Sequence, residues 1–398
     1  MMKNLSATTG RYLVLLRKDK PEHGIQRLAA LSNMQILSAQ GDEELGAATL
    51  PPQCAVVFHS IGVMLVRCAP EQQPSLRSLV TAEDSPILAV EPERSVRALA
   101  RVQDDPPLAD PVADELTWGV RAVGAALSPY TGKGVRIAIL DTGLDMEHPD
   151  FEGRTIVSRS FIHGEDVQDR NGHGTHCAGI AAGPLKPGSG PRYGVAGQAE
   201  LYVGKVLNNE GSGTEGGVLE GINWAIENEC QVVSLSLGSP VEEGEPYSRV
   251  FEEVARRALA AGTMLIAAAG NESRRPDYLA PVGHPANCPS IMAVGAVDEQ
   301  LHVAPFSCAG LNKDGGQVGI AAPGVNVRSA WTRPKLYNTI SGTSMATPFV
   351  AGVAALYAQA DKANRGRALW DRLVKQVRSL DDPERDVGAG LVHVSDKT

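Results

Sequence analysis

Short, almost continuously apolar runs alternate with longer amphipathic segments through most of the chain after residue 134. The runs have strand length, and the segments between them place apolar residues at the three- and four-residue spacing of a helix face. The expected strands are 135–140, 201–206, 232–237, 264–269 and 291–294, and the expected helices are 217–228, 249–261, 343–359 and one that begins near residue 174. This alternation predicts an α/β fold with a mainly parallel sheet, whose functional groups lie at the carboxyl ends of its strands.

The N-terminal part of the chain predicts a smaller unit of the same class. Strands are expected at 11–16 and 87–90, one or two more within 54–68, and helices at 23–31 and 71–80. The segment 104–111, Asp-Asp-Pro-Pro-Leu-Ala-Asp-Pro, then interrupts every periodicity, because proline lacks the backbone donor and acidic side chains stay hydrated. We therefore expect two domains, residues 1–112 including this linker and residues 113–398.

Composition excludes two classes of partner. The chain has 398 residues, of which 43% are hydrophobic, and its 37 basic and 46 acidic residues give a net charge of −9. No basic cluster accompanies this charge, so a nucleic-acid partner is not expected. No apolar run approaches the roughly 18 residues that span a bilayer, so no membrane span is expected either.

The N-terminus and the cysteines predict the compartment. The first apolar stretch, 12–16, has only strand length, which is too short for the apolar core of an ordinary secretory signal. Six cysteines are scattered without a close-spaced pair, a pattern typical of buried thiols in a reducing compartment. These features predict a cytoplasmic protein. Export by another route, or synthesis as part of a longer precursor, is the alternative.

Four polar residues stand where this type of fold carries chemistry. Asp141 directly follows the first strand of the larger domain, and His173 lies among small residues at the start of a helix, where it could act as a general base. Asn271 follows an apolar strand and could donate its amide to an oxyanion. Ser344 opens the last long helix, where free N–H groups favour a developing negative charge.

Each of these residues also has a simpler interpretation when taken alone. Asp141 could ligate a metal, and His173 with His176 could form a metal pair, although helical pairs are normally four residues apart. Asn at a strand end is commonly a turn residue, and a serine in a first turn is commonly an N-cap. His176 is expected to be buried and hydrogen-bonded. The functional interpretation therefore depends on the four residues occurring together.

Taken together, the four segments resemble the subtilisin-like serine proteases, or subtilases. The matching motifs are 138–143 (Ala-Ile-Leu-Asp-Thr-Gly), 171–176 (Asn-Gly-His-Gly-Thr-His), 269–271 (Ala-Gly-Asn) and 341–348 (Ser-Gly-Thr-Ser-Met-Ala-Thr-Pro), in the family's order Asp, His, Ser. The likeness extends over about residues 113–394, and the preceding domain resembles the family's inhibitory propeptide of the inhibitor-I9 type. The resemblance implies the three-layer subtilisin-like fold, preceded by a small ferredoxin-like α/β domain.

The same resemblance implies a hydrolase, a serine endopeptidase of peptidase family S8. Asp141 would orient His173, which would take the proton from Ser344 as that residue attacks the scissile carbonyl. Asn271 and the backbone N–H of Ser344 would hold the oxyanion. A protein or peptide substrate would bind in extended form between two cleft edges and a specificity pocket, formed by Gly211, Ser212, Gly213, Ser236, Leu237, Gly238 and Gly283.

No cofactor is required for this chemistry, and calcium is the structural ion that the resemblance suggests. Asp150 matches an acidic ligand of the family's tight calcium site, but the loop 183–191, which would supply most other ligands, has no amide or acidic side chain. Backbone carbonyls could still serve. Cys177, directly after the histidine motif, is either a thiol accessible to reagents or an inert buried one.

The resemblance also implies that the first domain is the enzyme's own inhibitory partner, with its C-terminal tail threaded through the cleft. We expect an autoprocessed zymogen that is cut between Arg101 and Ala113, and the alternative is a permanent accessory domain. Two competing functions are a catalytically idle binding protein and a peptide ligase that passes its acyl-enzyme to an amine. Fluorophosphonate labelling of Ser344 and the masses of peptide products would separate these functions.

Overall fold

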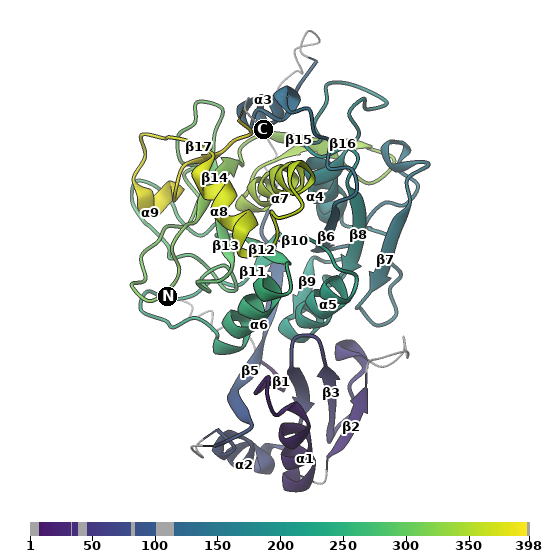
Figure 1. The fold of residues 1–398 in the computed structure, drawn as a ribbon, viewed down its shortest axis with the longest axis vertical. Coiled ribbons are helices and arrows are strands. Elements are labelled where there is room, and N and C mark those ends of the chain that lie inside the picture. The colour runs from purple at the N-terminus through teal and green to yellow at the C-terminus, as the bar shows by residue number, and fades with distance from the viewer. Residues whose placement is uncertain (1–7, 33, 39–45, 81–83, 101–114, 396–398) are drawn as a thin grey trace.

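A nine-stranded sheet forms the centre of the larger domain (Figure 1). The computed structural model describes residues 8–32, 34–38, 46–80, 84–100 and 115–395. The strand order is β17-β18-β14-β13-β12-β10-β6-β8-β7, and neighbours are parallel except for β17 and β18. The strands are β6 (Arg136–Asp141), β7 (Ile156–Ser160), β8 (Glu200–Lys205), β10 (Val232–Leu235), β12 (Met264–Ala268), β13 (Met292–Val297), β14 (Ile320–Pro323), β17 (Val377–Arg378) and β18 (Leu391–Val392). The predicted parallel sheet is confirmed.

Helices cover both faces of this sheet. One face packs against α4 (His173–Ala182), α7 (Thr343–Ala360) and α8 (Arg367–Lys375), and the other against α5 (Glu215–Glu227) and α6 (Arg249–Ala260). Alternate residues of β6 serve the two faces, since Ile137 and Ile139 join the first core and Ala138 and Leu140 join the second. The predicted three-layer α/β fold is therefore confirmed.

Shorter elements complete the larger domain. They are α3 (Trp118–Ala122), α9 (Glu384–Val387), the antiparallel pair β15 (Val327–Ala330) and β16 (Tyr337–Ile340), and 3₁₀ turns at Ala125–Leu127 and Pro149–Phe151. Within the described residues, no helix combines the length and apolar character needed to cross a membrane.

The smaller domain is a single sheet with helices on one side. Its elements are β1 (Thr8–Leu16), α1 (Pro21–Ser32), β2 (Gln35–Ser38), β3 (Cys54–Phe58), β4 (Val63–Arg67), α2 (Gln73–Ser78) and β5 (Ile87–Ala98), with 3₁₀ turns at Ala47–Thr49 and Pro70–Gln72. The order β5-β1-β4-β3 is antiparallel throughout and has the ferredoxin-like arrangement, and β2 adds a parallel edge strand beside β3. One sheet face packs on α1 and α2, and the other packs on α5 and α6.

Two glutamates of β5 cap the helices against which this sheet packs. The Glu91 carboxylate accepts hydrogen bonds from Ser248 Oγ at 2.5 Å and Arg249 N at 2.8 Å, at the start of α6. Glu93 is fully buried, accepts from Gly216 N at 2.8 Å in the first turn of α5, and pairs with Arg11 at 2.7 Å. The first N–H groups of a helix have no acceptor within that helix. A carboxylate at the N-terminus accepts their hydrogen bonds, and its negative charge interacts favourably with the positive end of the helix dipole.

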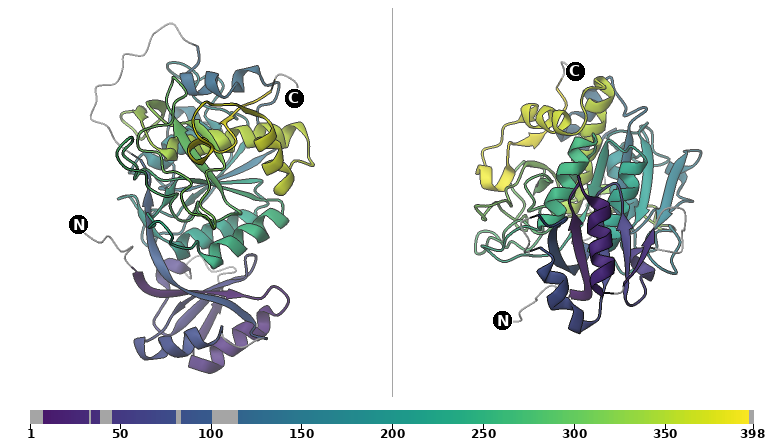
Figure 2. Two further views of the ribbon diagram at one scale, coloured as in Figure 1. Left: turned by 90° about the vertical axis from the view of Figure 1, so that its left-hand side faces the viewer. Right: turned by 60° about the horizontal axis from the view of Figure 1, so that its bottom comes forward.

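The last strand of the small domain is much longer than the sequence pattern predicts. The apolar run ends at residue 90, but β5 continues to Ala98 and passes from the smaller domain into the larger one (Figure 2). Its second half pairs with strands of the larger domain, so its length is set by partners that the local sequence does not reveal. The predicted domain boundary between residues 112 and 113 lies outside the described residues.

We predict that Glu93→Ala lowers the free energy of unfolding of the full chain by about 3 kcal/mol, because it leaves the partly buried Arg11 and a helix N–H without their acceptor. Urea denaturation measures the change. Glu22→Ala is the control, since Glu22 is an exposed acid in the first turn of α1 and its removal should cost little. Equal effects of the two substitutions would contradict the importance of this cap.

Candidate functional site

Four buried side chains gather at the carboxyl edge of the central sheet. Asp141 ends β6, His173 begins α4, Asn271 follows β12, and Ser344 lies in the first turn of α7, each at most 9% exposed. His173 Nδ1 and Asp141 Oδ1 are 2.7 Å apart, and Thr142 N donates to the same carboxylate oxygen at 2.7 Å. The structure thus joins a carboxylate and an imidazole that are 32 residues apart in the sequence.

This contact controls the protonation of His173. Burial disfavours the imidazolium, but the adjoining Asp141 carboxylate and Cys177 sulfur favour it more strongly, so the pKa of His173 lies above its ordinary value of 6.5. Its Nε2 atom is buried and has no hydrogen-bond partner among the residues that the structure describes. The imidazole can therefore take up a proton on the side that faces away from Asp141.

Ser344 lies close to this pair, but its hydroxyl is bonded elsewhere. Ser344 Oγ donates to Ser236 O at 2.9 Å, and Ser236 Oγ donates in return to Ser344 O at 2.8 Å. Cys177 Sγ lies 3.6 Å from Ser344 O and 3.9 Å from His173 Nδ1, so one thiol touches both residues. Within the described part of the chain, the Ser344 hydroxyl is thus bonded to Ser236 O and not to His173 Nε2.

A segment of the same chain occupies the groove beside these residues. Residues 95–98 of β5 run antiparallel between β9 (Ser212–Thr214) and β11 (Leu237–Gly238). Ala98 N donates to Gly211 O at 2.9 Å, and Leu99 N donates to Ser236 O at 3.3 Å. The predicted cleft residues that meet this segment are Gly211, Ser212, Gly213, Ser236, Leu237 and Gly238.

The carbonyl of Leu99 meets the amide of Asn271. Asn271 Nδ2 donates to Leu99 O at 2.6 Å, and Asn271 Oδ1 is held by Thr343 N and Thr343 Oγ1, both at 2.9 Å. The Leu99 side chain is 6% exposed and lies next to Gly238, where an added Cβ would come within 3.2 Å of it. Thr343 therefore orients the Asn271 amide, and the Nδ2 group of this amide points at the Leu99 carbonyl.

Gly283 belongs to the backbone around this groove. Its N–H donates to Ala269 O at 2.8 Å, and an added Cβ would lie 2.8 Å from Ser239 O. The approach of that carbonyl explains why the position is glycine. Its predicted place in a specificity pocket stays a prediction.

Two neighbours of His173 are buried and inert. The Nε2 atom of His176 lies 3.1 Å from Val327 O and 3.2 Å from Asn338 O, and burial together with the nearby His173 lowers its pKa to about 3. His176 is thus a neutral, hydrogen-bonded side chain, as predicted. Cys177 is fully buried, and this burial raises the pKa of its thiol. That environment favours the unreactive interpretation of Cys177.

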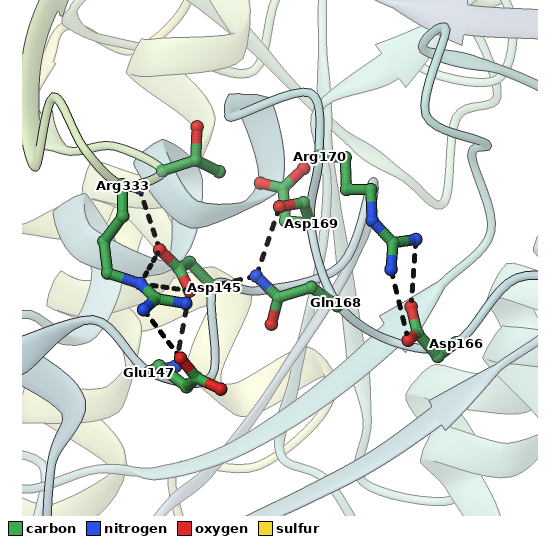
Figure 3. Close-up of a pocket in the computed structure, with 8 residues that line it drawn as sticks. Asp145, Glu147, Asp166, Gln168, Asp169, Arg170 and Arg333 are labelled. Atoms are coloured by element: carbon green, nitrogen blue, oxygen red, sulfur yellow. Dashed lines mark hydrogen bonds and ion pairs between the residues drawn. The ribbon is translucent and has the colours of Figure 1, made fainter.

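A polar cleft of about 550 Å³ opens beside the segment that precedes His173 (Figure 3). Its walls carry paired charges: Arg333 contacts Asp145 at 3.1 Å and Glu147 at 2.6 Å, and Arg170 contacts Asp166 at 3.4 Å. Burial raises the pKa of Asp145, but hydrogen bonds from Gln168 and Arg333 outweigh it and hold this pKa below its ordinary value. Because the acidic groups already have cationic or amide partners, their arrangement does not suggest a metal site.

The residues around Asp150 do not fit a calcium ion. Asp150 Oδ1 accepts from Gly188 N at 2.7 Å, and Oδ2 accepts from Tyr193 OH at 2.7 Å and Tyr337 OH at 3.0 Å. Burial and this carboxylate raise the pKa of both tyrosines, to about 12 for Tyr337, so both remain proton donors at neutral pH. A cation at these oxygens would face three donor hydrogens, whereas calcium requires an open set of oxygen ligands.

A guanidinium group supplies positive charge near the same loop. The Arg328 Cζ atom lies 4.9 Å from the centre of the Tyr337 ring, and an added Cβ at Gly190 would lie 3.0 Å from the Arg328 guanidinium. The loop 183–191 thus lies between the Asp150 carboxylate, which accepts from Gly188 N, and the Arg328 guanidinium. The calcium interpretation of Asp150 is not supported.

We predict that the unfolding midpoint of the Ser344→Ala variant is the same in EDTA and in calcium chloride. Asp150→Ala should lower that midpoint by several degrees, because each donor left buried without an acceptor costs roughly 1–3 kcal/mol. Differential scanning calorimetry checks both statements. Calcium-dependent stabilisation that disappears in Asp150→Ala would show that the ion binds after all.

Comparison with known proteins identifies the family. Residues 132–390 match the model of the subtilase family. The "Intracellular serine protease" of Paenibacillus polymyxa is 36% identical over 295 residues, which cover 71% of this chain and 86% of that protein. M-protease of Shouchella clausii is 34% identical over 378 residues, 94% of this chain and 87% of that protein. Subtilisin Savinase of Lederbergia lenta is 38% identical over 290 residues, 72% of this chain and 100% of that protein.

These similarities extend through all of the segments that bring Asp141, His173, Asn271 and Ser344 to one edge of the sheet. The chain therefore belongs to the subtilase family and is a serine endopeptidase.

Proposed function

We propose that this subtilase is a zymogen that cuts its own chain between Leu99 and Ala100, using Asp141, His173 and Ser344 as its catalytic triad. The observation that carries the proposal is the hydrogen bond of 2.6 Å from Asn271 Nδ2 to Leu99 O. An amide donor beside a serine nucleophile stabilises the oxyanion of the scissile carbonyl. The carbonyl that it contacts is therefore the best candidate for the cleaved bond.

The backbone hydrogen bonds support the same register. Residues 95–98 lie as the middle strand between β9 and β11, which is how an extended peptide binds by strand addition. Leu99 N bonds Ser236 O, the same carbonyl that accepts from the Ser344 hydroxyl. Ser236 O thus accepts hydrogen bonds from both Leu99 and the nucleophile Ser344. Binding of the strand therefore brings the scissile bond close to the nucleophile, as the reaction requires.

The reaction would begin with rotation of the Ser344 hydroxyl from Ser236 O to His173 Nε2. His173 accepts the proton as Ser344 Oγ attacks the Leu99 carbonyl carbon, and Asp141 stabilises the resulting imidazolium. Asn271 Nδ2 and the Ser344 N–H hold the oxyanion. His173 then returns the proton to the Ala100 nitrogen, which leaves, and water hydrolyses the acyl-enzyme by the same route.

The first domain would remain bound after this cut and act as an inhibitor. The new carboxyl terminus at Leu99 stays paired with β9 and β11, and Glu91 and Glu93 still cap α6 and α5. Free substrate would have to displace this strand. The expected cut between Arg101 and Ala113 lies outside the described residues, and the hydrogen bonds of Leu99 favour an earlier position.

We predict that purified wild-type protein separates into residues 1–99 and 100–398, whereas Ser344→Ala stays intact. Mass spectrometry of the fragments, with N-terminal sequencing of the larger one, gives the position of the cut. Val96→Ala is a control that leaves the backbone register unchanged. A larger fragment that begins after Arg101 would contradict the register, and an intact wild type with full peptidase activity would contradict the zymogen.

We also predict that kcat/KM of the processed enzyme increases with pH through a pKa above 6.5, the ordinary value for histidine. His173 must be neutral to accept the proton, and its raised pKa keeps it protonated, and the enzyme inactive, up to a higher pH. Assays of a peptide substrate across pH measure the transition. Asp141→Asn removes the charge that raises this pKa and should lower kcat by about 10⁴-fold. A transition at or below pH 6.5 in the wild type would contradict the assignment.

A further inference from the structure

A buried carboxylate with no role in the proposed chemistry lies behind the catalytic histidine. Asp169 is 1% exposed and belongs to the segment between β7 and α4, on the wall of the polar cleft (Figure 3). Its Oδ1 atom accepts from Thr142 Oγ1 at 3.0 Å and from Asn171 N and Gly172 N at 2.9 Å, and its Oδ2 atom accepts from Thr175 N at 2.9 Å and Thr175 Oγ1 at 2.7 Å. Every one of these partners belongs to the two segments that carry Asp141 and His173.

Helix α4 depends on this carboxylate for its first turn. Gly172, the residue before the helix, has a φ of 104° and no side chain with which to cap it. The first three N–H groups of α4 are satisfied from outside the helix: His173 N by Asn171 Oδ1, Gly174 N by Thr142 Oγ1 and Thr175 N by Asp169 Oδ2. The orientation of the turn that presents His173 is therefore set by these three acceptors.

Thr142 connects the same carboxylate to the catalytic aspartate. Its hydroxyl donates to Asp169 Oδ1 and accepts from Gly174 N at 2.8 Å, while its own N–H donates to Asp141 Oδ1 at 2.7 Å. One hydroxyl thus joins the end of β6, the start of α4 and Asp169. A shift of Asp169 would move the carboxylate and the imidazole of the triad relative to each other.

The contacts of Asp169 are with backbone N–H groups and threonine hydroxyls, not with the imidazole. The neighbours that raise the pKa of His173 are Asp141 and Cys177, which touch it directly. The contribution of Asp169 is therefore geometric. Asp169 holds the end of β6 and the start of α4 so that Asp141 Oδ1 and His173 Nδ1 lie 2.7 Å apart.

We infer that Asp169 is a positioning residue for the proteolytic reaction, which holds the turn after Asp141 and the first turn of α4 in one arrangement. The inference depends on the proposed triad. Positioning acts on the reaction of bound substrate, so its loss should appear in kcat and leave KM nearly unchanged.

Asp169→Asn is the sharpest test. The oxygen of the new asparagine side chain can still accept hydrogen bonds at the position of Oδ1. Its NH₂ group then takes the position of Oδ2 and faces Thr175 N, which is itself a donor. We expect kcat on a peptide substrate to fall about 10²-fold, as for a displacement of catalytic groups by about 1 Å, with KM unchanged within about twofold. Fluorophosphonate labelling of Ser344 should slow by a similar factor.

Asp166→Asn is the matched control, because Asp166 lies in the same loop, is exposed and pairs only with exposed Arg170 among the described contacts. Its kcat and labelling rate should equal those of the wild type. Thr142→Ser keeps the connecting hydroxyl and should keep activity, whereas Thr142→Val should lower kcat, and its effect combined with Asp169→Asn should be less than additive.

Unfolding midpoints of the same variants in the Ser344→Ala background distinguish positioning from loss of fold. A fall in activity that disappears when the assay temperature is lowered well below the midpoint, or a normal kcat with a raised KM, would overturn the inference. Failure of the wild type to cut at Leu99 would contradict the proposed zymogen only, because the peptide assay tests Asp169 without that cut.

Discussion

The pairing of residues 95–99 with the two edges of the cleft is the interaction on which the rest of this structure depends. Main-chain hydrogen bonds set its register without regard to side-chain identity, so the strand brings one carbonyl, that of Leu99, to the Asn271 amide. The same bonds that present this peptide for attack would retain it afterwards. Under the proposed zymogen function, substrate positioning and inhibition would both follow from one strand between β9 and β11, and the smaller domain would anchor that strand.

Carboxylates accept hydrogen bonds from N–H groups at the starts of three helices, α4, α5 and α6. Glu91 and Glu93 accept from N–H groups at the starts of α6 and α5 at the interface between the domains, and Asp169 accepts from the N–H group of Thr175 in the first turn of α4, beside His173. In each case the carboxylate comes from outside the helix that it caps, so the cap also fixes one element against another. The hydrogen bonds that cap these helices thus also hold separate segments of the chain in place relative to one another.

The environment of Asp150 shows how its neighbours decide what a buried acidic residue can bind. Two tyrosine hydroxyls and one backbone N–H occupy its oxygens, and Arg328 lies against one of the tyrosine rings. Three donor hydrogens therefore satisfy the Asp150 carboxylate. Motif matching finds the aspartate but does not reveal its partners, which come from β16 and from residues near the loop 183–191.

The sequence alone predicted five strands of the central sheet, the helices α4, α5, α6 and α7, and the segments that carry Asp141, His173, Asn271 and Ser344, because apolar periodicity and short motifs are local properties. It did not predict the strands β7, β14, β17 and β18 or the helix α8. The second half of β5 was not predicted, because residues 95–98 (Ser-Val-Arg-Ala) pair with β9 and β11, which lie far away in the sequence. Nor did the sequence single out Asp169, since an aspartate in a polar loop has no distinguishing pattern until five donors from two segments surround it. Hydrogen bonds between residues distant in sequence depend on the packed geometry. The register of residues 95–99 and the support of the Asp141–His173 pair therefore could not be predicted from the sequence.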